Sequence, residues 1–310
     1  MPKIPFDIIN DKSFADIPAS EPDVKAYLPK VGISNRPHYI SVVDPFTKEP
    51  TRLLADIITS FDLPAKQRGL HMSRIEGSLH KIAASSPVEV SGYTAKLFEL
   101  NKESQKQNNC RIELSADYEI EVDKNESKRP SYELLKLYSA IEDKDGKRSV
   151  ETGITVPFIN ACPCTQRWGM KAFYEELKAD GYKDEEIFAL IEKAPLQAHT
   201  NRGEATITVH SDKVDYKTLY KVVEDSTVII RELLSGQDEH FAVRDTHKNG
   251  QFCEDVIREV MANLVKRLDT KLPDETKVRI HVEVDESVHF HNLFAEIIDS
   301  FANIKASIEN

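Results

Sequence analysis

Residues 111–122 read Arg-Ile-Glu-Leu-Ser-Ala-Asp-Tyr-Glu-Ile-Glu-Val, and this stretch decides the fold. From Ile112 to Val122, apolar or weakly polar side chains alternate strictly with polar ones. Successive side chains of a β-strand point to opposite faces, so the pattern predicts a strand with one buried face and one solvated face. Such half-buried strands are typical of antiparallel sheets.

Neighbouring stretches repeat this alternation. The polar turn 124–130 separates the first strand from its expected hairpin partner at 135–141, and a tight turn at 143–146 leads to a strand at 150–158. Strands joined by hairpins predict an antiparallel sheet with one face buried. Further strands are expected at 38–43, 205–209 and 277–285, the last as the final strand of the chain.

Helical spacing of apolar residues fills the gaps between the strands. Residues 75–108 have this spacing, with an interruption at Pro87 to Gly92 and a second helix from about 88 to 105. Two long helices between strands, twice over, predict an α+β fold made of two copies of one unit, at 31–150 and 151–310. An extended, proline-rich arm at 1–30 precedes them. The other expected helices are 168–178, 184–194, 216–234, 253–268 and one at the C-terminus.

Composition limits the class of protein. A chain of 310 residues with 40% hydrophobic and 30% charged residues is typical of a globular protein with a sizeable core. No apolar run approaches about 20 residues, and the first residues lack the apolar stretch of a signal peptide. Four unevenly spaced cysteines do not form a secreted disulfide framework, so a reducing cytoplasm is expected. A net charge of −11 argues against nucleic acid as a partner and requires local positive charge for any polyanionic substrate.

The tripeptide Cys162-Pro163-Cys164 follows the strand at 150–158. Pro163 fixes its own φ and favours an extended Cys162, so the two sulfurs are held in a defined relation. Thiols presented at a strand end can bind a metal or transfer protons, and cysteines so close in sequence form only strained disulfides. The alternative is that both are small packing residues.

Four other segments place polar groups at the ends of expected elements, where folds commonly present functional side chains. Together they supply imidazole and carboxylate ligands which, with a thiolate, suit Zn²⁺, Fe²⁺ or Mn²⁺. The segments are Gln197 to Glu204, Asp238-Glu239-His240, Phe252 to Asp255, and Glu286 to His291.

Each of these residues also has an ordinary structural explanation. His199 can cap a strand, and Glu239 and Glu254 are two of many acids that solvent would cover. His289 and His291 point to opposite faces of an extended backbone, unless a local turn brings both inward.

A resemblance links these segments. The stretch Phe61-x-Leu63-Pro64-x-x-x-Arg68-Gly69-x-His71-Met72-Ser73-Arg74 resembles the signature of the type IB GTP cyclohydrolases. That family also has Cys-Pro-Cys, His-x-x-Arg, Asp-Glu, Phe-x-Glu-Asp and Glu-Ser-x-His-x-His segments, and all occur here in that order. The resemblance spans roughly residues 30 to 300.

Three details resemble the archaeal branch of that family: Cys164-Thr165-Gln166, the helical insertion before His199, and the His-Thr-x-Arg-Gly form. That branch is a GTP cyclohydrolase of methanopterin biosynthesis, which produces 7,8-dihydroneopterin 2′,3′-cyclic phosphate. The bacterial branch produces 7,8-dihydroneopterin triphosphate for folate.

The resemblance implies two tandem tunnelling-fold units, each an antiparallel sheet with helices packed on one face. It also implies a homodimer or homotetramer with active sites at the interfaces. One divalent metal per subunit is implied, Fe²⁺ in the archaeal branch and Mn²⁺ or Zn²⁺ in relatives. Its implied ligands are Cys162, His199, Glu239 and His289.

The reaction implied is hydrolysis at carbon 8 of guanine followed by loss of formate, catalysed by a hydrolase that acts on cyclic amidine C–N bonds. Glu286 would bind guanine through its N1–H and 2-amino groups. The candidates for proton transfer are Cys164, Glu254 and His291. The candidates for binding phosphates are Arg68, His71, Ser73, Arg74 and Arg202, which could otherwise be ordinary surface residues.

Two alternatives to this activity remain at the level of sequence. One is a catalytically silent metal-binding protein on the same fold, against which the presence of Cys164 and Glu254 argues. The other is a reductase or pterin synthase of the same fold, which would need a nicotinamide site or a His-rich zinc site. Asn292 stands where bacterial relatives commonly have aspartate, and the resemblance assigns no role to His240 or His247.

Overall fold

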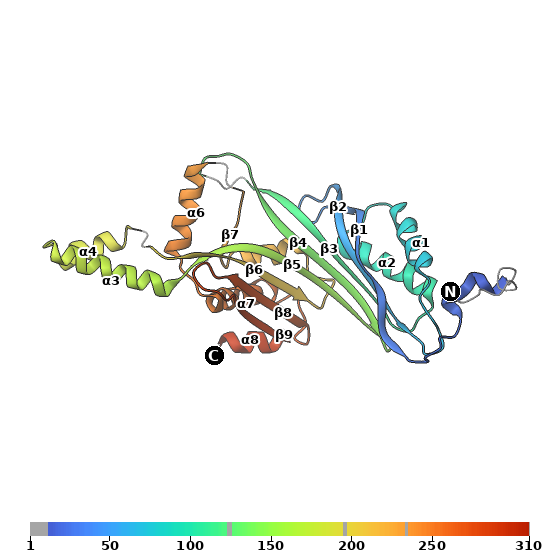
Figure 1. Ribbon diagram of the computed structural model, residues 1–310. Helices are drawn as coiled ribbons and strands as arrows, with labels where there is room; N and C mark the ends of the chain where they lie inside the picture. Colours follow the sequence, from blue (N-terminus) through green and yellow to red (C-terminus); the bar gives the residue numbers. More distant parts are fainter. Residues whose placement is uncertain (1–11, 123–125, 195–196, 233–234, 310) are drawn as a thin grey trace, which may run out of the picture. The chain divides into compact units, whose positions relative to one another are not determined.

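The computed structural model describes residues 12–122, 126–194, 197–232 and 235–309. Contacts between residues divide the chain into two compact units (Figure 1). Residues 1–116 and 139–151 form unit 1, and residues 117–138 and 152–310 form unit 2. Three strands have part of their residues in unit 1 and the rest in unit 2: β3 (Cys110–Val122), β4 (Ser131–Lys144) and β5 (Lys147–Ala161). Whether the units are two copies of one ancestral fold stays a prediction.

Unit 1 has its sheet and its two helices in one compact body. Strand β1 (Leu28–Val43) pairs with β2 (Pro50–Leu63), and β2 pairs with β3, all antiparallel. Helices α1 (Met72–Ala83) and α2 (Val90–Gln105) pack on each other, and α2 also contacts β1. The strictly alternating residues of β3 pack as expected: Ile112 and Leu114 are fully buried. Each such side chain contributes about 1.5–3 kcal/mol of burial free energy.

The predicted N-terminal arm lies partly outside the described residues, since its first eleven positions are not among them. Residues 12–19 form a 3-10 helix, η2 (Lys12–Ala19), and β1 begins at Leu28. The arm is therefore interrupted by a helical turn rather than extended throughout.

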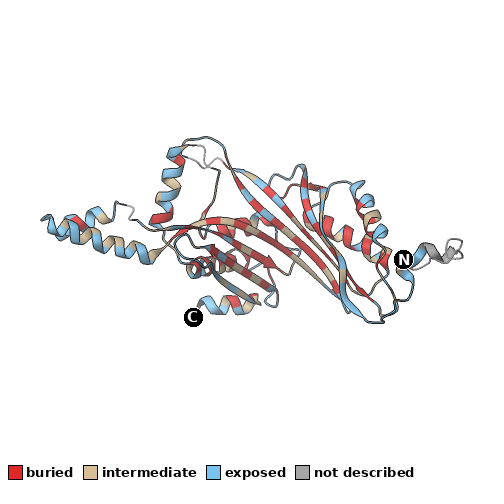
Figure 2. Cartoon of the chain, in the orientation of Figure 1, coloured by how far each residue is buried: buried red, intermediate tan, exposed pale blue. Residues whose placement is uncertain are grey.

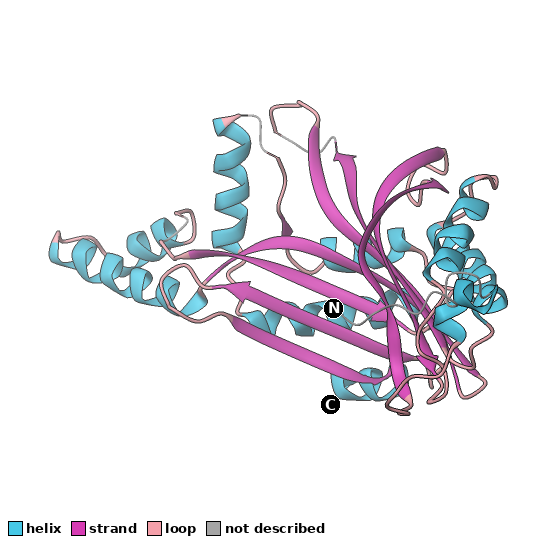
Figure 3. Ribbon diagram, turned by 45° about the vertical axis from the view of Figure 1, so that its right-hand side comes forward, coloured by secondary structure: helices cyan, strands magenta, loops and turns pink. Residues whose placement is uncertain are grey.

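Unit 2 holds the second part of the sheet, in the order β5, β6 (Thr200–Val209), β8 (Lys277–Asp285) and β9 (Leu293–Ser300). All these pairs are antiparallel, and the short β7 (Val228–Ile229) pairs with β5. Helix α7 (Cys253–Leu268) packs on β8 and β9, with α5 (Tyr216–Glu224) and α8 (Phe301–Glu309) against it. Buried residues follow the strands and one side of these helices (Figure 2). Figure 3 shows the helices and strands in separate colours. The antiparallel strands and covering helices confirm the α+β class.

Helices α3 (Pro163–Ala179) and α4 (Asp184–Ile191) form the insertion before His199. They pack against each other through stacked rings of Tyr174 and Phe188. Helix α3 has no buried residue. The insertion is thus held together by its own two helices.

Two predicted elements are wrong, and one helix was not predicted. The helix expected at 216–234 ends at Glu224, because the β-branched run Thr227 to Ile230 leaves the helix and forms β7. Helix α6 (Gly236–Lys248), capped by Ser235, was not expected. Strand β8 is not the final strand, because β9 comes after it. The apolar pairs of β9, such as Leu293-Phe294, hide the alternation that identified the other strands.

Candidate active site at the ends of strands β5, β6 and β8

A pocket of about 180 Å³ lies in unit 2, where β5 runs into α3, β6 begins and β8 ends. It brings together several predicted site residues that are far apart in sequence. Its lining residues are Asn160, Cys162, His199, Asn201, Gln251, Phe252, Cys253, Glu286, His289, His291 and Leu293.

Cys162 reaches this pocket because of how β5 ends. It keeps an extended backbone (φ −68°, ψ 114°) as the N-cap residue of α3, and Pro163 occupies the first turn of the helix, where a missing N–H costs nothing. The Cys162 N–H donates to the His199 carbonyl over 3.1 Å. This bond joins the end of β5 to the start of β6, so the thiol and the imidazole belong to one rim.

His199, the residue just before β6, is held by Asn201 of β6 and by Glu286, which follows β8. Its Nδ1 lies 3.1 Å from Asn201 Oδ1 and 3.7 Å from Glu286 Oε2. Asn201 Nδ2 donates to Glu286 Oε1 over 3.0 Å, and the Ser287 N–H donates to Asn201 Oδ1 over 3.0 Å. One buried amide therefore connects the start of β6 with the segment after β8.

Two buried acceptors of the pocket lack a hydrogen-bond partner among the described residues. One is Glu286 Oε2, on a side chain that is only 7% exposed. The other is Asn160 Oδ1, whose Nδ2 donates to the Gln251 carbonyl over 2.9 Å. Buried acceptors are nearly always satisfied, so both oxygens point to a ligand with hydrogen-bond donors.

The two histidines after β8 both line the pocket. Residues 287–291 form a series of bends, and the rings of His289 and His291 stack with centroids 5.3 Å apart. The His289 ring also meets the His199 ring edge-on at 6.1 Å. A local turn thus places both imidazoles on one side, as the second sequence interpretation required. Asn292 donates to Asp285 Oδ1 over 2.8 Å and so anchors the end of this segment.

The pocket also contains Cys253, which belongs to the Phe252 to Asp255 segment but for which no role was expected. Cys253, at the start of α7, is buried, and its thiol lies 3.5 Å from the Val282 carbonyl. Burial raises the pKa of this thiol to about 11, so it is protonated at neutral pH and serves packing.

Four other predicted residues of unit 2 lie outside this pocket. Glu239 is exposed in the first turn of α6, beside the buried Asp238, and Glu254 is exposed next to Cys253. Cys164 is exposed in the first turn of α3. Arg202 is exposed on the opposite face of β6 from Asn201. Within the described residues, no three His, Cys, Asp or Glu side chains are grouped closely enough to hold a metal ion.

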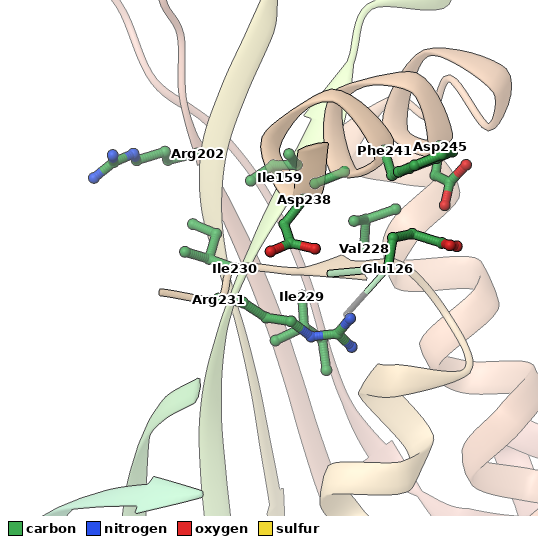
Figure 4. Close-up of a pocket in the computed structure, with 11 residues that line it drawn as sticks. Glu126, Ile159, Arg202, Val228, Ile229, Ile230, Arg231, Asp238, Phe241 and Asp245 are labelled. Carbon is green, nitrogen blue, oxygen red and sulfur yellow. The ribbon is translucent and has the colours of Figure 1, made fainter. Parts of the chain in front are cut away.

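Arg202 lines a second cavity of unit 2, of about 280 Å³. Figure 4 shows its guanidinium directed away from the Asp238 carboxylate. Asp238 is tied to Ser127 by bonds of 2.9 Å to the backbone N–H and 2.6 Å to the hydroxyl. The Ser127 hydroxyl and N–H lower the pKa of Asp238, so the carboxylate stays ionised and anchors α6. Arg231 also lines this cavity.

Four predicted phosphate ligands lie in unit 1, around the start of α1. The His71 ring contacts Asp16 over 2.6 Å, and this hydrogen bond lowers the pKa of Asp16. Arg68 lies 3.7 Å from Asp23, and Arg74 donates to the Ser104 carbonyl over 3.2 Å. Arg68, Ser73 and Arg74 are exposed to solvent, whereas the His71 side chain is only 16% exposed and its Nδ1 is buried without a hydrogen-bond partner among the described residues.

Of the histidines without an expected role, His247 has a structural one. It is buried, with Nε2 3.1 Å from the Ala198 carbonyl and Nδ1 2.8 Å from the Val243 carbonyl. It thereby fixes α6 to the residue just before His199. His240 is exposed on α6. Among the helices of the described residues, none combines the length and apolar composition that crossing a membrane requires.

Comparison with known proteins points to one family. A family model described as "Type I GTP cyclohydrolase folE2" matches residues 14–295. The chain is 31% identical to GTP cyclohydrolase MptA of Methanococcus aeolicus, over 96% of this chain and all of that protein. It is 30% identical to GTP cyclohydrolase MptA of Methanococcus maripaludis strain C6, over 91% of this chain and 93% of that protein.

The fold is similar to that of a solved structure. A uricase from Bacillus fastidious covers 91% of this chain and 96% of its own, with a TM-score of 0.50 and 7% sequence identity. At that identity the likeness concerns the fold alone, and it confirms the expected tunnelling-fold architecture.

Proposed function

The chain belongs to the type I GTP cyclohydrolase folE2 family and is a hydrolase that acts on GTP, and from this premise we propose a metal-dependent reaction with a cyclic product. In this proposal, water opens the guanine ring at carbon 8 and a second hydrolysis releases formate. The product is 7,8-dihydroneopterin 2′,3′-cyclic phosphate of the methanopterin pathway. A side-chain oxygen of the pterin forms the second bond to the α-phosphorus as the bond to the β-phosphate breaks, so the two outer phosphates leave together as pyrophosphate.

The observation that supports this proposal is the composition of the 180 Å³ pocket. It gathers Cys162, His199 and His289 with a buried, half-satisfied carboxylate, Glu286. Thiolate and imidazole suit Fe²⁺ and Zn²⁺, and in this proposal the three side chains would move closer together to hold the ion, because no three such groups are close enough to do so among the described residues. Glu239, the fourth implied ligand, lies outside the pocket, on α6. A bound divalent cation supplies a lowered pKa for water, towards about 7.

Glu286 supplies the recognition of guanine in this proposal. Its Oε2 is buried and has no partner among the described residues, and Oε1 keeps a second lone pair beside the one that Asn201 uses. A carboxylate presented in this way can accept from both N1–H and the 2-amino group. Adenine has neither donor at those positions, so it leaves the carboxylate buried and unpaired.

Proton transfer falls to residues in and beside the pocket. His291 lines the pocket. Glu254 follows the lining residue Cys253 directly, and Cys164 lies two residues after the lining residue Cys162. An imidazole, a thiol and a carboxyl can each be brought into the working range by burial and by a neighbouring charge. The phosphates would be bound by Arg68, His71, Ser73, Arg74 and Arg202, and we propose that the protein acts as a homodimer or homotetramer.

Product analysis tests the reaction. The protein is incubated anaerobically with GTP and Fe²⁺, pterin fluorescence is recorded, and the products are weighed by mass spectrometry. A cyclic monophosphate with one formate per GTP is expected. The triphosphate would replace the proposed product by that of the folate branch, and the absence of any pterin would indicate a silent metal-binding protein.

Two variants test the assigned roles. Cys162→Ala is expected to lose both bound iron and activity, whereas Cys110→Ala, which removes a buried thiol of unit 1, retains the metal. Stoichiometric iron in Cys162→Ala contradicts the ligand assignment. Glu254→Ala is expected to bind metal normally and to lose turnover, and full turnover excludes Glu254 from the mechanism.

A further inference from the structure

Asn201 contacts both Glu286 and His199, to which the proposed function assigns the guanine base and the metal. It lies on β6, lines the pocket and is 4% exposed. Its amide contacts the Ser287 N–H, the Glu286 carboxylate and the His199 ring. A buried amide with every polar atom engaged has one fixed orientation.

That orientation is set by the partners. The Ser287 N–H can only donate, so the atom that faces it at 3.0 Å is the amide oxygen. The amide nitrogen then faces Glu286 Oε1 at 3.0 Å, and an ionised carboxylate can only accept. Both contacts agree, and the reverse orientation would break both.

The same oxygen determines the tautomer of His199. Nδ1 lies 3.1 Å from Asn201 Oδ1, which is an acceptor, so Nδ1 carries the hydrogen. In the neutral ring Nε2 then keeps its lone pair. Metal-binding histidines are commonly held in this way, with the other ring N–H donated to an oxygen.

Glu286 is oriented by the amide nitrogen. With Oε1 engaged by Asn201, Oε2 is left as the buried acceptor without a partner in the described chain. No other donor to the Glu286 carboxylate is present among the described residues apart from the His199 ring at 3.7 Å. Without Asn201, the Glu286 carboxylate would lose the hydrogen bond that fixes its orientation and could rotate within the pocket.

We propose that Asn201 is a positioning residue of the cyclohydrolase: it turns Glu286 towards the guanine base and fixes His199 with Nε2 free for the metal. This inference rests on the proposed function, because it assigns Glu286 to the base and His199 to the ion. Asn201 itself touches neither the substrate nor the metal in this proposal.

Two substitutions separate these effects. Asn201→Asp keeps the oxygen that faces Ser287 and His199 but places a carboxylate against Glu286. Asn201→Ser is too short to keep either contact. Asn101→Ser is the matched control, because Asn101 is a fully buried asparagine of α2 in unit 1 whose Nδ2 donates to the Leu97 carbonyl.

The readouts are the binding of GTP and of inosine triphosphate to the metal-free protein, and the iron bound per chain after anaerobic loading. Inosine triphosphate lacks the 2-amino group, so the ratio of the two dissociation constants reports on Glu286. Asn201→Asp should lower the preference for GTP about 10-fold or more and still bind one equivalent of iron. Asn201→Ser should lose both, and Asn101→Ser should keep both even where it lowers the melting temperature.

The inference is overturned if both Asn201 variants prefer GTP over inosine triphosphate as strongly as the wild-type protein does. It is also overturned if Asn201→Ser binds one equivalent of iron and has an unchanged ratio of the two dissociation constants. If Asn201→Asp does not fold, as judged by circular dichroism, Asn201→Ser decides on the same two readouts. A wild-type protein that does not prefer GTP overturns the proposed role of Glu286 and this inference together. If the wild-type protein prefers GTP but the Asn201 variants do not show the expected changes, only the inference about Asn201 is overturned.

Discussion

Replacing Arg231 by methionine would leave a buried charge without its partner. Glu133, on β4, is fully buried in unit 2. Its Oε1 accepts from Arg231 Nε over 2.6 Å, and its Oε2 accepts from the Tyr220 hydroxyl over 2.5 Å. Burial, together with the bond to Glu133, raises the pKa of Tyr220, so the phenol remains a neutral donor. Arg231 is the cation of this group.

The expected loss is large. Methionine fills much of the space but leaves the Glu133 carboxylate with one neutral hydrogen bond, and breaking a buried pair in this way costs about 3–5 kcal/mol of unfolding free energy. For 310 residues, an unfolding entropy of about 2.1 cal/mol/K per residue gives about 0.65 kcal/mol per degree. The melting temperature should therefore fall by about 5–8 °C if the chain unfolds as one cooperative unit.

Thermal unfolding followed by far-ultraviolet circular dichroism at pH 7 measures this loss. Arg258→Met is the control, because Arg258 pairs with Asp255 on the surface and such pairs contribute about 1 kcal/mol or less. Adding Glu133→Gln to Arg231→Met removes the stranded charge and should restore part of the stability. If Arg231→Met unfolds at the same temperature as Arg258→Met, the carboxylate is not buried as described and the reasoning fails.

Three further outcomes are expected. Ser127→Ala should destabilise the protein more at pH 7 than at pH 3, because the folded protein lowers the pKa of Asp238. The ionised Asp238 carboxylate stabilises the folded protein fully above the ordinary pKa of about 3.9, and this stabilisation is lost as the pH falls through the lowered pKa. Equal decreases in melting temperature at both pH values would contradict this. Gly203→Ala should lower the unfolding free energy, measured by urea denaturation, by about 1–3 kcal/mol. A Cβ at position 203 would lie 2.5 Å from the Phe158 ring of β5 and 2.7 Å from the Glu283 carbonyl oxygen of β8. An unchanged urea midpoint would contradict this prediction. A thiol reagent at pH 8 should modify the exposed Cys164 quickly and leave Cys253 intact, since the pKa of the buried thiol is about 11, and mass mapping of the labelled peptides would reveal the reverse.

The sequence allowed the fold to be predicted where one face of an element is buried and the other is not. The alternation from Ile112 to Val122 gives β3 almost residue for residue, because its partners cover a single face. It could not reveal β9, where Leu293, Phe294 and Ile298 are exposed apolar residues on both faces. Helical spacing from Tyr216 also extended the expected helix past Glu224, because such spacing does not show where tertiary pairing with β5 ends a helix.

The candidate site was predictable in its charged and sulfur-containing residues. The motifs gave Cys162, His199, Glu286, His289 and His291, all of which line one pocket. Neutral amides were missed, because asparagine is common on surfaces and only burial makes its contacts informative.

One feature of the sequence could have identified Asn201: residues two positions apart on a strand face the same side. His199 and Asn201 differ by two residues and face one side, whereas Arg202 faces the other. The pairing of β5 with β6 supports the same division, because Asn160 pairs with Asn201 and Ile159 pairs with Arg202.

This alternation of faces divides a motif that reads as one unit. In the His-x-x-Arg segment, the histidine side of the strand meets the pocket with Cys162 and Glu286, and the arginine side meets the cavity with Ile159 and Arg231. A residue spacing of three on a strand always separates its members in this way. If both residues act on one GTP molecule, its base and its phosphates must therefore be bound on opposite faces of β6, or the arginine must act on a nucleotide held by another subunit. The second arrangement requires no ligand to pass around a strand edge, and it depends on the homo-oligomer that we propose.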